Sequence, residues 1–543
     1  MDADLSVPLP TNEPVLTFLP GSQERRTLRR RLAELKDRAV DIPAFINGRE
    51  VRTGRTVEIH PPHELSQTLG VFHSCGPAEA EFAINAAVAA RHDWARTPLP
   101  QRAEVFLKAA DLLAGPWRDT LNAATMLGQS KSAHQAEIDS ACELIDFLRF
   151  NVHFAERIGA DQPFSPAGVH NSMDYRPLEG FVLAVSPFNF TSIAGNLPTA
   201  PAIMGNTVVW KPARTAALSA YFIYKLLAEA GLPDGVINLV VGPGAELGDC
   251  VLRSPDLAGL HFTGSVGTFQ GMWRTIGANI AGYRAYPRIV GETGGKNFII
   301  AHASADLAAL STAIVRGAFE YQGQKCSAAS RVYVPDTLWD DLKDRLLADL
   351  GTIRMGPVED FSNFVNAVID RKAYDRIISY IEHARQSPDT EIIAGGRYCD
   401  DEGYFIEPTV ILAAQPDYRS MREEIFGPVA TIYVYPAGRF PEALRLVDRT
   451  SPFALTGAIF AQDRTAIAEA ADALLDAAGN FYVNDKPTGA VVGQQPFGGG
   501  RASGTNDKAG SHLNLLRWTS PRTLKETFDP ATDFGYPFMQ PDA

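Results

Sequence analysis

Short apolar segments that alternate with helical segments after residue 175 constrain the fold of this chain more than any other feature. The five segments are Phe181–Val185, Thr207–Trp210, Ile237–Val241, Leu257–Phe262 and Arg288–Val290. Between them, apolar residues recur at spacings of three and four, most clearly over 216–230. This alternation predicts a doubly wound parallel sheet with helices on both faces. In such a sheet a nucleotide binds beyond the carboxyl ends of the strands.

A second α/β unit is predicted to begin near residue 297, as a chain of 543 residues requires more than one packed unit. Its predicted strands are Phe298–Ala301, Arg331–Val334, Thr409–Leu412, Val429–Tyr435, Gly457–Phe460 and Phe481–Val483. At the other end of the chain, residues 1–60 predict a helix and then a hairpin that turns at Asn47-Gly48. Residues 77–157 predict helices.

Composition excludes several classes of partner. A net charge of −13 argues against nucleic acid, because phosphate binding needs a concentrated positive field. No stretch approaches the roughly 20 apolar residues of a membrane span, so no membrane partner is expected. The five cysteines show neither CxxC nor CxxxH spacing. They indicate reduced thiols in a cytoplasmic protein and no metal site.

Two loops carry residues suited to nucleophilic catalysis. Cys326 lies among small and polar residues after a predicted helix, and Glu292 lies in a separate glycine-rich loop after a predicted strand. A thiolate nucleophile and its base meet in space and not in sequence. Lys325 is expected to help lower the pKa of the Cys326 thiol. Asn189, at another strand end, offers a donor for a developing oxyanion, or else closes an Asx-turn. Glu292 is equally open to being a solvated glutamate.

The signals for a cofactor are distributed over several loops. The first α/β unit has no GxGxxG fingerprint, but Gly242-Pro243-Gly244 and Thr263-Gly264-Ser265 each stand where a strand leads into a helix. Small residues at a helix N-terminus suit a pyrophosphate, although they also make ordinary tight turns. Lys211 ends a strand, where its ammonium could reach a ribose or a phosphate, or could simply be exposed.

Taken together, these motifs resemble the aldehyde dehydrogenase superfamily from about residue 45 to 525. The matching pieces are Pro187-Phe188-Asn189-Phe190, Trp210-Lys211-Pro212, Phe262-Thr263-Gly264-Ser265, Glu292-Thr293-Gly294-Gly295-Lys296, Gln324-Lys325-Cys326 and Glu423-Glu424-Ile425-Phe426-Gly427-Pro428. The resemblance implies an α/β fold with a Rossmann-like NAD-binding domain, an α/β catalytic domain and a small β oligomerisation extension. It assigns 1–164 and 178–292 to the first domain, 293–512 to the second, and 165–177 and 513–543 to segments that bridge subunits.

A closer resemblance is to the branch of the superfamily that oxidises L-glutamate γ-semialdehyde to L-glutamate in proline catabolism. It rests on Ser186-Pro187-Phe188-Asn189-Phe190-Thr191, Tyr321-Gln322-Gly323-Gln324-Lys325-Cys326-Ser327-Ala328, Asn480-Phe481-Tyr482-Val483-Asn484-Asp485-Lys486 and Thr488-Gly489-Ala490-Val491-Val492-Gly493-Gln494-Gln495-Pro496-Phe497-Gly498-Gly499. The implied catalytic residues are Cys326 as nucleophile, Glu292 as base for water, and Asn189 as oxyanion donor.

The same resemblance implies the binding residues. Those for the cofactor are Pro187, Phe188, Lys211, Gly264, Ser265, Glu424 and Phe426. Those for the substrate are Glu143, Phe190, Ser327, Gly489, Ala490 and Phe497, with Glu143 open to being a structural buried carboxylate instead. NAD is the expected cofactor. NADP stays possible because Arg214, three residues after Lys211, could accommodate a 2′-phosphate.

Three alternatives stay open from the sequence: an aldehyde dehydrogenase for another carboxylate-bearing or simple aldehyde, a CoA-acylating relative, and a non-catalytic protein that retains the fold. The expected partners are a small-molecule substrate, a second copy of the chain in a homodimer or larger homo-oligomer, and transiently a separate proline dehydrogenase.

Overall fold

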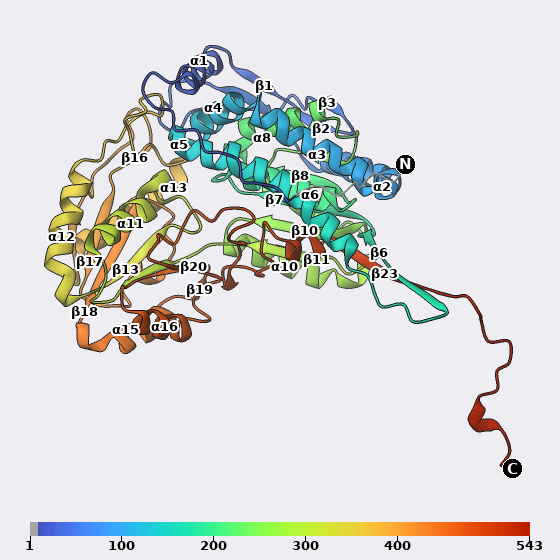
Figure 1. The fold of residues 1–543 in the computed structure, drawn as a ribbon. Coiled ribbons are helices and arrows are strands. Elements are labelled where there is room, and N and C mark those ends of the chain that lie inside the picture. The colour runs from blue at the N-terminus through green and yellow to red at the C-terminus, as the bar shows by residue number, and fades with distance from the viewer. Residues whose placement is uncertain (1–8, 543) are drawn as a thin grey trace.

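The computed structural model describes residues 9–542. Two lobes, each built around a seven-stranded sheet, lie side by side, and a thin ribbon with the C-terminal tail projects from them (Figure 1). A three-stranded sheet, ordered β1-β5-β4, lies beside the first lobe and comprises β1 (Val40–Ile42), β4 (Thr56–Ile59) and β5 (Gly70–His73).

The sheet of the first lobe has the order β11-β10-β7-β8-β9-β2-β3. Its parallel strands are β7 (Phe181–Ser186), β8 (Thr207–Pro212), β9 (Ile237–Leu239), β10 (Leu257–Thr263) and β11 (Arg288–Glu292). All five strands were predicted from their apolar runs. The predicted hairpin is also confirmed, as β2 (Ala44–Ile46) and β3 (Arg49–Val51) pair antiparallel and Asn47 and Gly48 both have positive φ.

Helices cover both faces of this sheet, as the alternation predicts. Within β7, Phe181 and Leu183 face a core shared with α2, α9 and α10, whereas Val182 and Ala184 face the core of α3, α4, α6, α7 and α8. These helices are α2 (Pro77–Arg96), α3 (Leu99–Ala114), α4 (Arg118–Gln129), α6 (Leu144–Ala160), α7 (Thr191–Ile203), α8 (Ala217–Ala230), α9 (Gly244–Leu252) and α10 (Val266–Ala278). An N-terminal helix, α1 (Gln23–Asp37), packs on α4.

The strand order reverses between β7 and β10, because the chain moves outward from β7 through β8 and β9 and then returns to the other side of β7. In open α/β sheets the ligand crevice lies at such a switch point, beyond the carboxyl ends of the strands. The loops that start at Pro187 and Gly264 leave β7 and β10 at this point. The topology therefore brings the two predicted cofactor loops together.

The sheet of the second lobe has the order β14-β17-β18-β13-β12-β20-β21 and is parallel apart from β14. Its strands are β12 (Asn297–Ala301), β13 (Ala329–Pro335), β14 (Thr390–Ala394), β17 (Thr409–Ala413), β18 (Val429–Tyr435), β20 (Thr456–Phe460) and β21 (Asn480–Val483). The helices are α11 (Leu307–Phe319), α12 (Asp336–Gly351), α13 (Arg371–Gln386), α15 (Phe440–Arg449) and α16 (Arg464–Ala473). The edge strand β14 was not predicted.

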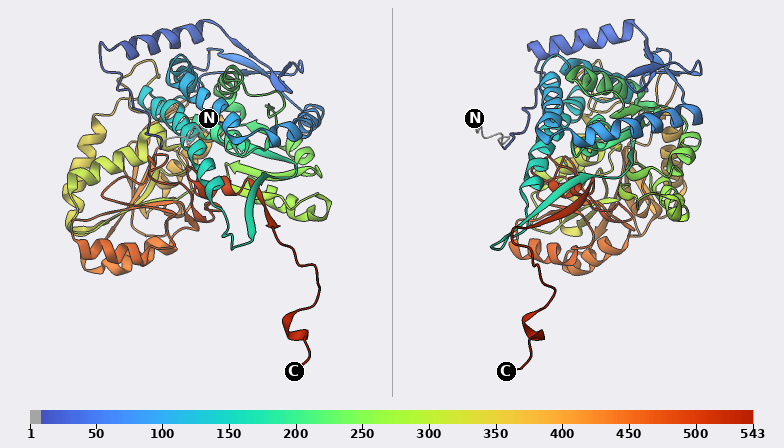
Figure 2. Two further views of the ribbon diagram at one scale, coloured as in Figure 1. Left: turned by 45° about the vertical axis from the view of Figure 1, so that its right-hand side comes forward. Right: turned by 90° about the vertical axis from the view of Figure 1, so that its right-hand side faces the viewer.

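A two-stranded ribbon leaves the body next to the first lobe. Strand β6 (Val169–Pro177) pairs antiparallel with β23 (Thr519–Thr527) over nine residue pairs, and the tail continues beyond it (Figure 2). Just before β23, Trp518 is fully buried and its ring lies 4.6 Å from that of His261, between ring centroids. The body thus extends to residue 518. The division into domains inferred from the sequence stays a prediction, and residues 1–8 and 543 lie outside the described residues.

Candidate active site

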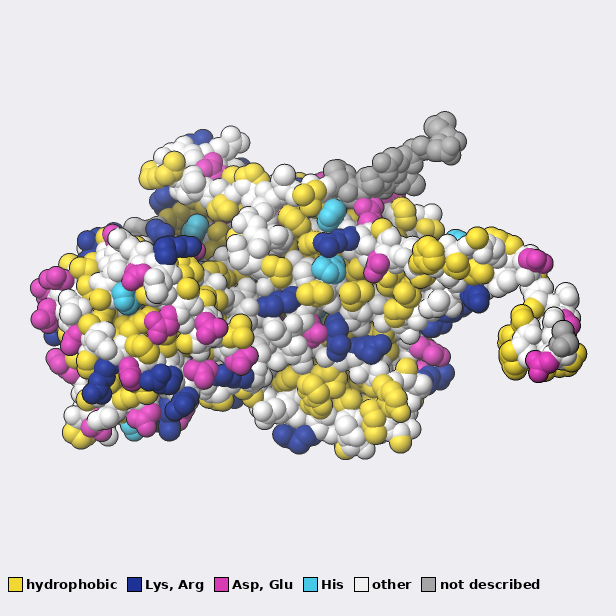
Figure 3. All heavy atoms as spheres, turned by 60° about the horizontal axis from the view of Figure 1, so that its bottom comes forward, with side chains coloured by type: hydrophobic (Ala, Val, Ile, Leu, Met, Phe, Trp, Pro, Cys, Tyr) yellow, Lys and Arg dark blue, Asp and Glu magenta, His cyan; other side chains and the backbone are white. Residues whose placement is uncertain are grey.

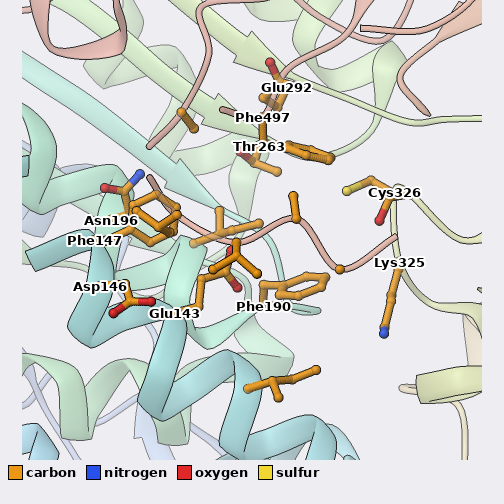
Figure 4. A pocket seen from close by; sticks show the side chains of 18 of the residues that line it. Glu143, Asp146, Phe147, Phe190, Asn196, Thr263, Glu292, Lys325, Cys326 and Phe497 are labelled. Carbon is orange, nitrogen blue, oxygen red and sulfur yellow. The ribbon is translucent and has the colours of Figure 1, made fainter. Parts of the chain in front are cut away.

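A cavity of about 470 Å³ lies between the two lobes. Its lining brings together many of the residues singled out in the sequence: Glu143, Phe190, Glu292, Cys326, Ser327, Gly489, Ala490 and Phe497. Phe190 and Phe497 form opposite walls, and the Cys326 thiol points into the space between them (Figure 4). Residues separated by more than 340 positions thus converge on one thiol.

A strained turn presents Cys326. Tyr321, Gln322 and Gly323 all have positive φ, between 52° and 64°. A Cβ on Gly323 would lie 2.2 Å from the carbonyl oxygen of Gly427, so only glycine fits there. Strain of this kind persists where the surrounding structure holds it, commonly at a functional site. Here the Gln322 amide donates to two buried carbonyls, those of Ser130 and Ala367, at 2.9 and 2.8 Å.

The glycine-rich loop after β11 packs directly against the cysteine. A Cβ on Gly295 would lie 2.3 Å from the Cys326 carbonyl oxygen, which explains why this position is glycine. The Asn297 amide then donates to the Cys326 carbonyl at 2.7 Å. Asn189, which follows the end of β7, reaches the loop that carries Cys326. Its amide donates to the Gln324 carbonyl at 3.0 Å. The three predicted catalytic residues therefore lie on loops that meet at the thiol.

The pKa of the Cys326 thiol is raised to about 12, first by burial and then by the charges of Glu292, Glu424 and Glu143. The prediction that Lys325 helps lower the pKa of this thiol is wrong for this structure. The Lys325 ammonium points away from the thiol (Figure 4) and pairs with Glu320 at 3.1 Å, where both side chains are buried. A thiol with so high a pKa is protonated at neutral pH, so it must lose its proton to act as a nucleophile.

Glu292 ends β11 in a shielded place. Within residues 9–542 its Oε2 has no hydrogen-bond partner, although it is out of contact with solvent. Burial raises the pKa of this carboxyl well above its usual range, while the Gly499 backbone N–H and Lys508 act in the opposite direction. A carboxylate whose pKa is raised is a stronger base, as proton abstraction from water requires.

Glu143 lies at the end of an irregular helical segment. Residues Glu137–Glu143 form a π-helix between α5 (Ala133–Ala136) and α6, where the sequence predicted one continuous helix. Such bulges occur frequently at functional sites. The Glu143 Oε2 accepts from Ser192 Oγ at 2.8 Å, and burial followed by the charge of Asp139 raises the pKa of Glu143 to about 8.

A buried ion pair beneath Phe190 was not predicted from the sequence. Lys131 and Asp139, both fully buried, are joined at 2.7 Å. Asp139 also accepts from the backbone N–H groups of Thr191 and Ser192 at the start of α7, each at 2.9 Å. The Lys131 ammonium lies 4.2 Å from the centroid of the Phe190 ring, a cation–π contact that fixes the ring. Such a pair is visible only in the tertiary structure.

The residues of the first lobe that were predicted to hold a cofactor lie at or just beyond the carboxyl ends of its strands: Lys211 near the end of β8, and Gly264 and Ser265 directly after β10. Ser265 caps α10, accepting a hydrogen bond from the Thr268 backbone N–H. Lys211 extends toward Gly244 at the start of α9, and a Cβ there would lie 3.8 Å from the lysine Cε. Burial, and then the charge of Arg214, lowers the pKa of Lys211 to about 8.

The remaining residues predicted to bind the cofactor are Glu424 and Phe426 of the second lobe and Pro187 and Phe188 of the first. Glu424 accepts a hydrogen bond from the Gly295 backbone N–H at 2.8 Å. The rings of Phe426 and Phe188 meet edge to face, with centroids 5.8 Å apart. Pro187 comes directly after β7, next to Phe188. None of the residues predicted to bind the cofactor lines the cavity that contains Cys326, and their role stays a prediction.

The described residues 9–542 contain no helix that is both long and apolar enough to cross a membrane. In the same range, no group of three His, Cys, Asp or Glu side chains is arranged to hold a metal ion.

The aldehyde dehydrogenase family model matches residues 50–524. The chain is 52% identical over 540 residues to the mitochondrial delta-1-pyrroline-5-carboxylate dehydrogenase of Dictyostelium discoideum, covering 99% of this chain and 97% of that protein. It is 49% identical over 530 residues to the human mitochondrial enzyme of the same name, covering 97% and 94% of the two chains. The expectation of a cytoplasmic location is contradicted by these names, since both relatives are named as mitochondrial.

The structure agrees with the sequence comparison. It superposes with a TM-score of 0.96 on the crystal structure of the delta-pyrroline-5-carboxylate dehydrogenase from Mycobacterium tuberculosis bound with NAD, at 54% identity and covering 99% of this chain and 100% of that one. The family model matches most of the length of this chain, and relatives about 50% identical match it almost end to end. The chain therefore belongs to the aldehyde dehydrogenase family.

Proposed function

We propose that the chain oxidises L-glutamate γ-semialdehyde, the open form of 1-pyrroline-5-carboxylate, to L-glutamate with NAD, the step that completes proline catabolism. The observation that carries this function is one cavity shared by a buried cysteine, a carboxyl of raised pKa, and the residues suited to anchoring a carboxylate. The relatives that match the whole chain are named for this substrate.

Chemistry begins at Cys326. Its sulfur attacks the aldehyde carbon while the thiol proton leaves, and a thiohemiacetal forms. The Asn189 amide, which reaches the cysteine loop, stabilises the oxyanion. This carbon then loses a hydride, for which NAD held by Lys211 and Glu424 would supply the acceptor, and a thioester remains on the sulfur. Glu292 then removes a proton from water, which attacks the thioester and releases the carboxylic acid and the thiol.

The crevice fits NAD in its charges and its backbone. The N-terminus of α10, a helix of 13 residues, offers N–H groups to a pyrophosphate next to Ser265 and Gly264. Lys211 has no acidic side chain as a partner within residues 9–542, and burial and then the charge of Arg214 lower its pKa, so a bound anion would be favourable beside it. We assign Lys211 and Glu424 to the two riboses, and Pro187, Phe188 and Phe426 to the nicotinamide end.

The substrate has a carboxylate that a simple aldehyde lacks. Ser327 is buried, and its hydroxyl is 2.7 Å from that of Thr488, next to Gly489 with φ +95°. We assign the α-carboxylate to Ser327 and to the backbone N–H groups of Gly489 and Ala490. Phe190 and Phe497 enclose the aliphatic chain, and Glu143 faces the ammonium.

The ribbon of β6 and β23 supports a homo-oligomer. Beyond it the tail exposes aromatic side chains: Phe534 is 88% exposed, Tyr536 67% and Phe538 84% (Figure 3). Exposed apolar groups on a projecting arm are costly in water and indicate a protein contact. We propose that the arm packs on a second copy of the chain, and that a separate proline dehydrogenase contacts the assembly transiently. Deleting residues 528–543 should lower the mass measured by light scattering.

The function is tested by the absorbance of reduced nicotinamide. Purified protein is mixed with glutamate γ-semialdehyde and either NAD or NADP, with Cys326→Ala in parallel. We expect cysteine-dependent reduction of NAD with glutamate as product. Turnover of simple aldehydes alone would refute the substrate and leave the chemistry. Reduction that persists in Cys326→Ala would refute the nucleophile.

A further inference from the structure

Residues 12–16, called here the N-terminal strap, cross one wall of the cavity. They precede the part of the chain that the family model matches, which starts at residue 50. Nevertheless Asn12, Glu13 and Val15 line the same cavity as Cys326. A segment outside the matched domain thus forms part of the substrate site.

Partly buried ion pairs hold the strap in place. Glu13 lies between Arg118 and Arg149, at 2.6 and 2.7 Å, and its side chain is only 11% exposed. The backbone N–H groups of Glu13 and Leu16 donate to Asp146 and Glu137, at 2.8 and 2.9 Å. Charged groups buried to this degree fix geometry, because breaking one pair leaves an uncompensated charge. The strap is therefore a rigid support.

Asn12 connects this support to the loop that carries Gly489 and Ala490. Its Nδ2 donates both to Asp146 Oδ2 and to the Val492 carbonyl, each at 2.8 Å. Its Oδ1 accepts from Gln494 Nε2 at 2.9 Å. A carboxylate could not replace the amide, since both Nδ2 contacts need a donor.

The other side of the loop rests on α6. Val492 packs against Phe147 and Phe150. A Cβ on Gly493, whose φ is +80°, would lie 2.3 Å from a carbon of Phe150. The loop is thus clamped between an apolar helix face and the Asn12 amide. Ala490, two residues before Val492, lines the cavity.

We propose that Asn12 is a positioning residue, which holds residues 489–494 so that the backbone N–H groups of Gly489 and Ala490 converge on the substrate carboxylate. This inference rests on the proposed function. A loop held before binding costs less ordering entropy when the ligand arrives. Asn12 acts on affinity for aldehydes that carry a carboxylate, and not on the chemistry at Cys326.

The test compares Asn12→Ala with Thr11→Ala, which changes an exposed neighbour on the same segment. Loss of the amide contacts is expected to raise KM for glutamate γ-semialdehyde about tenfold, with kcat within about twofold, since one net hydrogen bond is worth roughly that factor. For propanal, which has no carboxylate, kcat/KM should stay unchanged. Gln494→Ala, which removes one contact of three, should raise KM less. Thr11→Ala should behave as wild type.

Hydrogen–deuterium exchange of the peptide over 488–495 gives a readout that needs no substrate. Faster exchange in Asn12→Ala but not in Thr11→Ala is expected. Unchanged exchange, or an equal loss of activity toward both aldehydes, would overturn the positioning role. If the wild-type protein does not oxidise the semialdehyde although exchange rises in the variant, the proposed function fails while the hold of Asn12 on the loop stands.

Discussion

The substitution Asn189→Ala tests whether the Asn189 amide stabilises the oxyanion or only holds the structure together. Asn189 is 3% exposed and donates to the Gln324 carbonyl at 3.0 Å, so the substitution removes the donor and leaves a buried carbonyl without a partner. The first loss should lower kcat about 100-fold, or roughly 2.7 kcal/mol of transition-state stabilisation. The second should lower the free energy of unfolding by about 1–3 kcal/mol.

Asn196→Ala is the matched control. Asn196 is also 3% exposed and accepts from the Asn151 amide at 2.9 Å. It lines the cavity that contains Cys326 but lies away from the thiol (Figure 4). Both variants should lose similar stability, measured by chemical denaturation. Only Asn189→Ala should lose kcat, measured by reduction of NAD at saturating aldehyde. If kcat of the two variants agrees within about tenfold, Asn189 is not the oxyanion donor.

Four further results are expected. Glu292→Gln should release one equivalent of reduced nicotinamide in a burst and then turn over slowly, because water is no longer activated. In the wild type the rate should rise with pH through the raised pKa of Glu292, and this rise should be absent in the variant. Glu143 has a folded-state pKa of about 8, above its unfolded value, so it binds its proton more tightly in the folded state. The Tm of the wild type should therefore fall from pH 5 to pH 8. Glu143→Gln should make this dependence of Tm on pH weaker, and an unchanged dependence would contradict the raised pKa. Lys325→Met should lower the free energy of unfolding by about 3–5 kcal/mol, because it leaves the buried Glu320 carboxylate without its partner. The pH dependence of thiol alkylation should not change. Adding Glu320→Gln should restore part of the stability measured by chemical denaturation. Lys211→Ala should raise KM for NAD about tenfold or more with little change in KM for the aldehyde, whereas an equal rise in both would exclude a cofactor-specific role.

Local sequence patterns were sufficient for the parallel strands of the two large sheets. The strands of a buried parallel sheet are continuous apolar runs, so Phe181–Val185 and Leu257–Phe262 were visible before any contact was known. The Asn47-Gly48 turn could also be predicted, because the conformation of such a turn depends on the two residues themselves. The edge strand β14 was missed, since its residues are only partly buried and lack such a run.

Other features depended on charges and distances that no local pattern contains. Lys325 is adjacent to Cys326 in sequence but turned toward Glu320, so its expected effect on the thiol was wrong. The π-helix that ends at Glu143 interrupts a sequence whose apolar spacing suggests an ordinary helix.

The sequence by itself determined the two α/β units, the family, and the residue types available for a thiol-based oxidation, because these depend on periodicity and on short ordered motifs. Only the tertiary structure decided which of those residues share a cavity, how burial and neighbouring carboxylates raise the pKa of Cys326, and that Asn12, 314 positions before Cys326, supports the substrate loop. The physical reason is that desolvation and hydrogen bonding act through space over a few ångströms, whereas sequence patterns record only which neighbours follow along the chain.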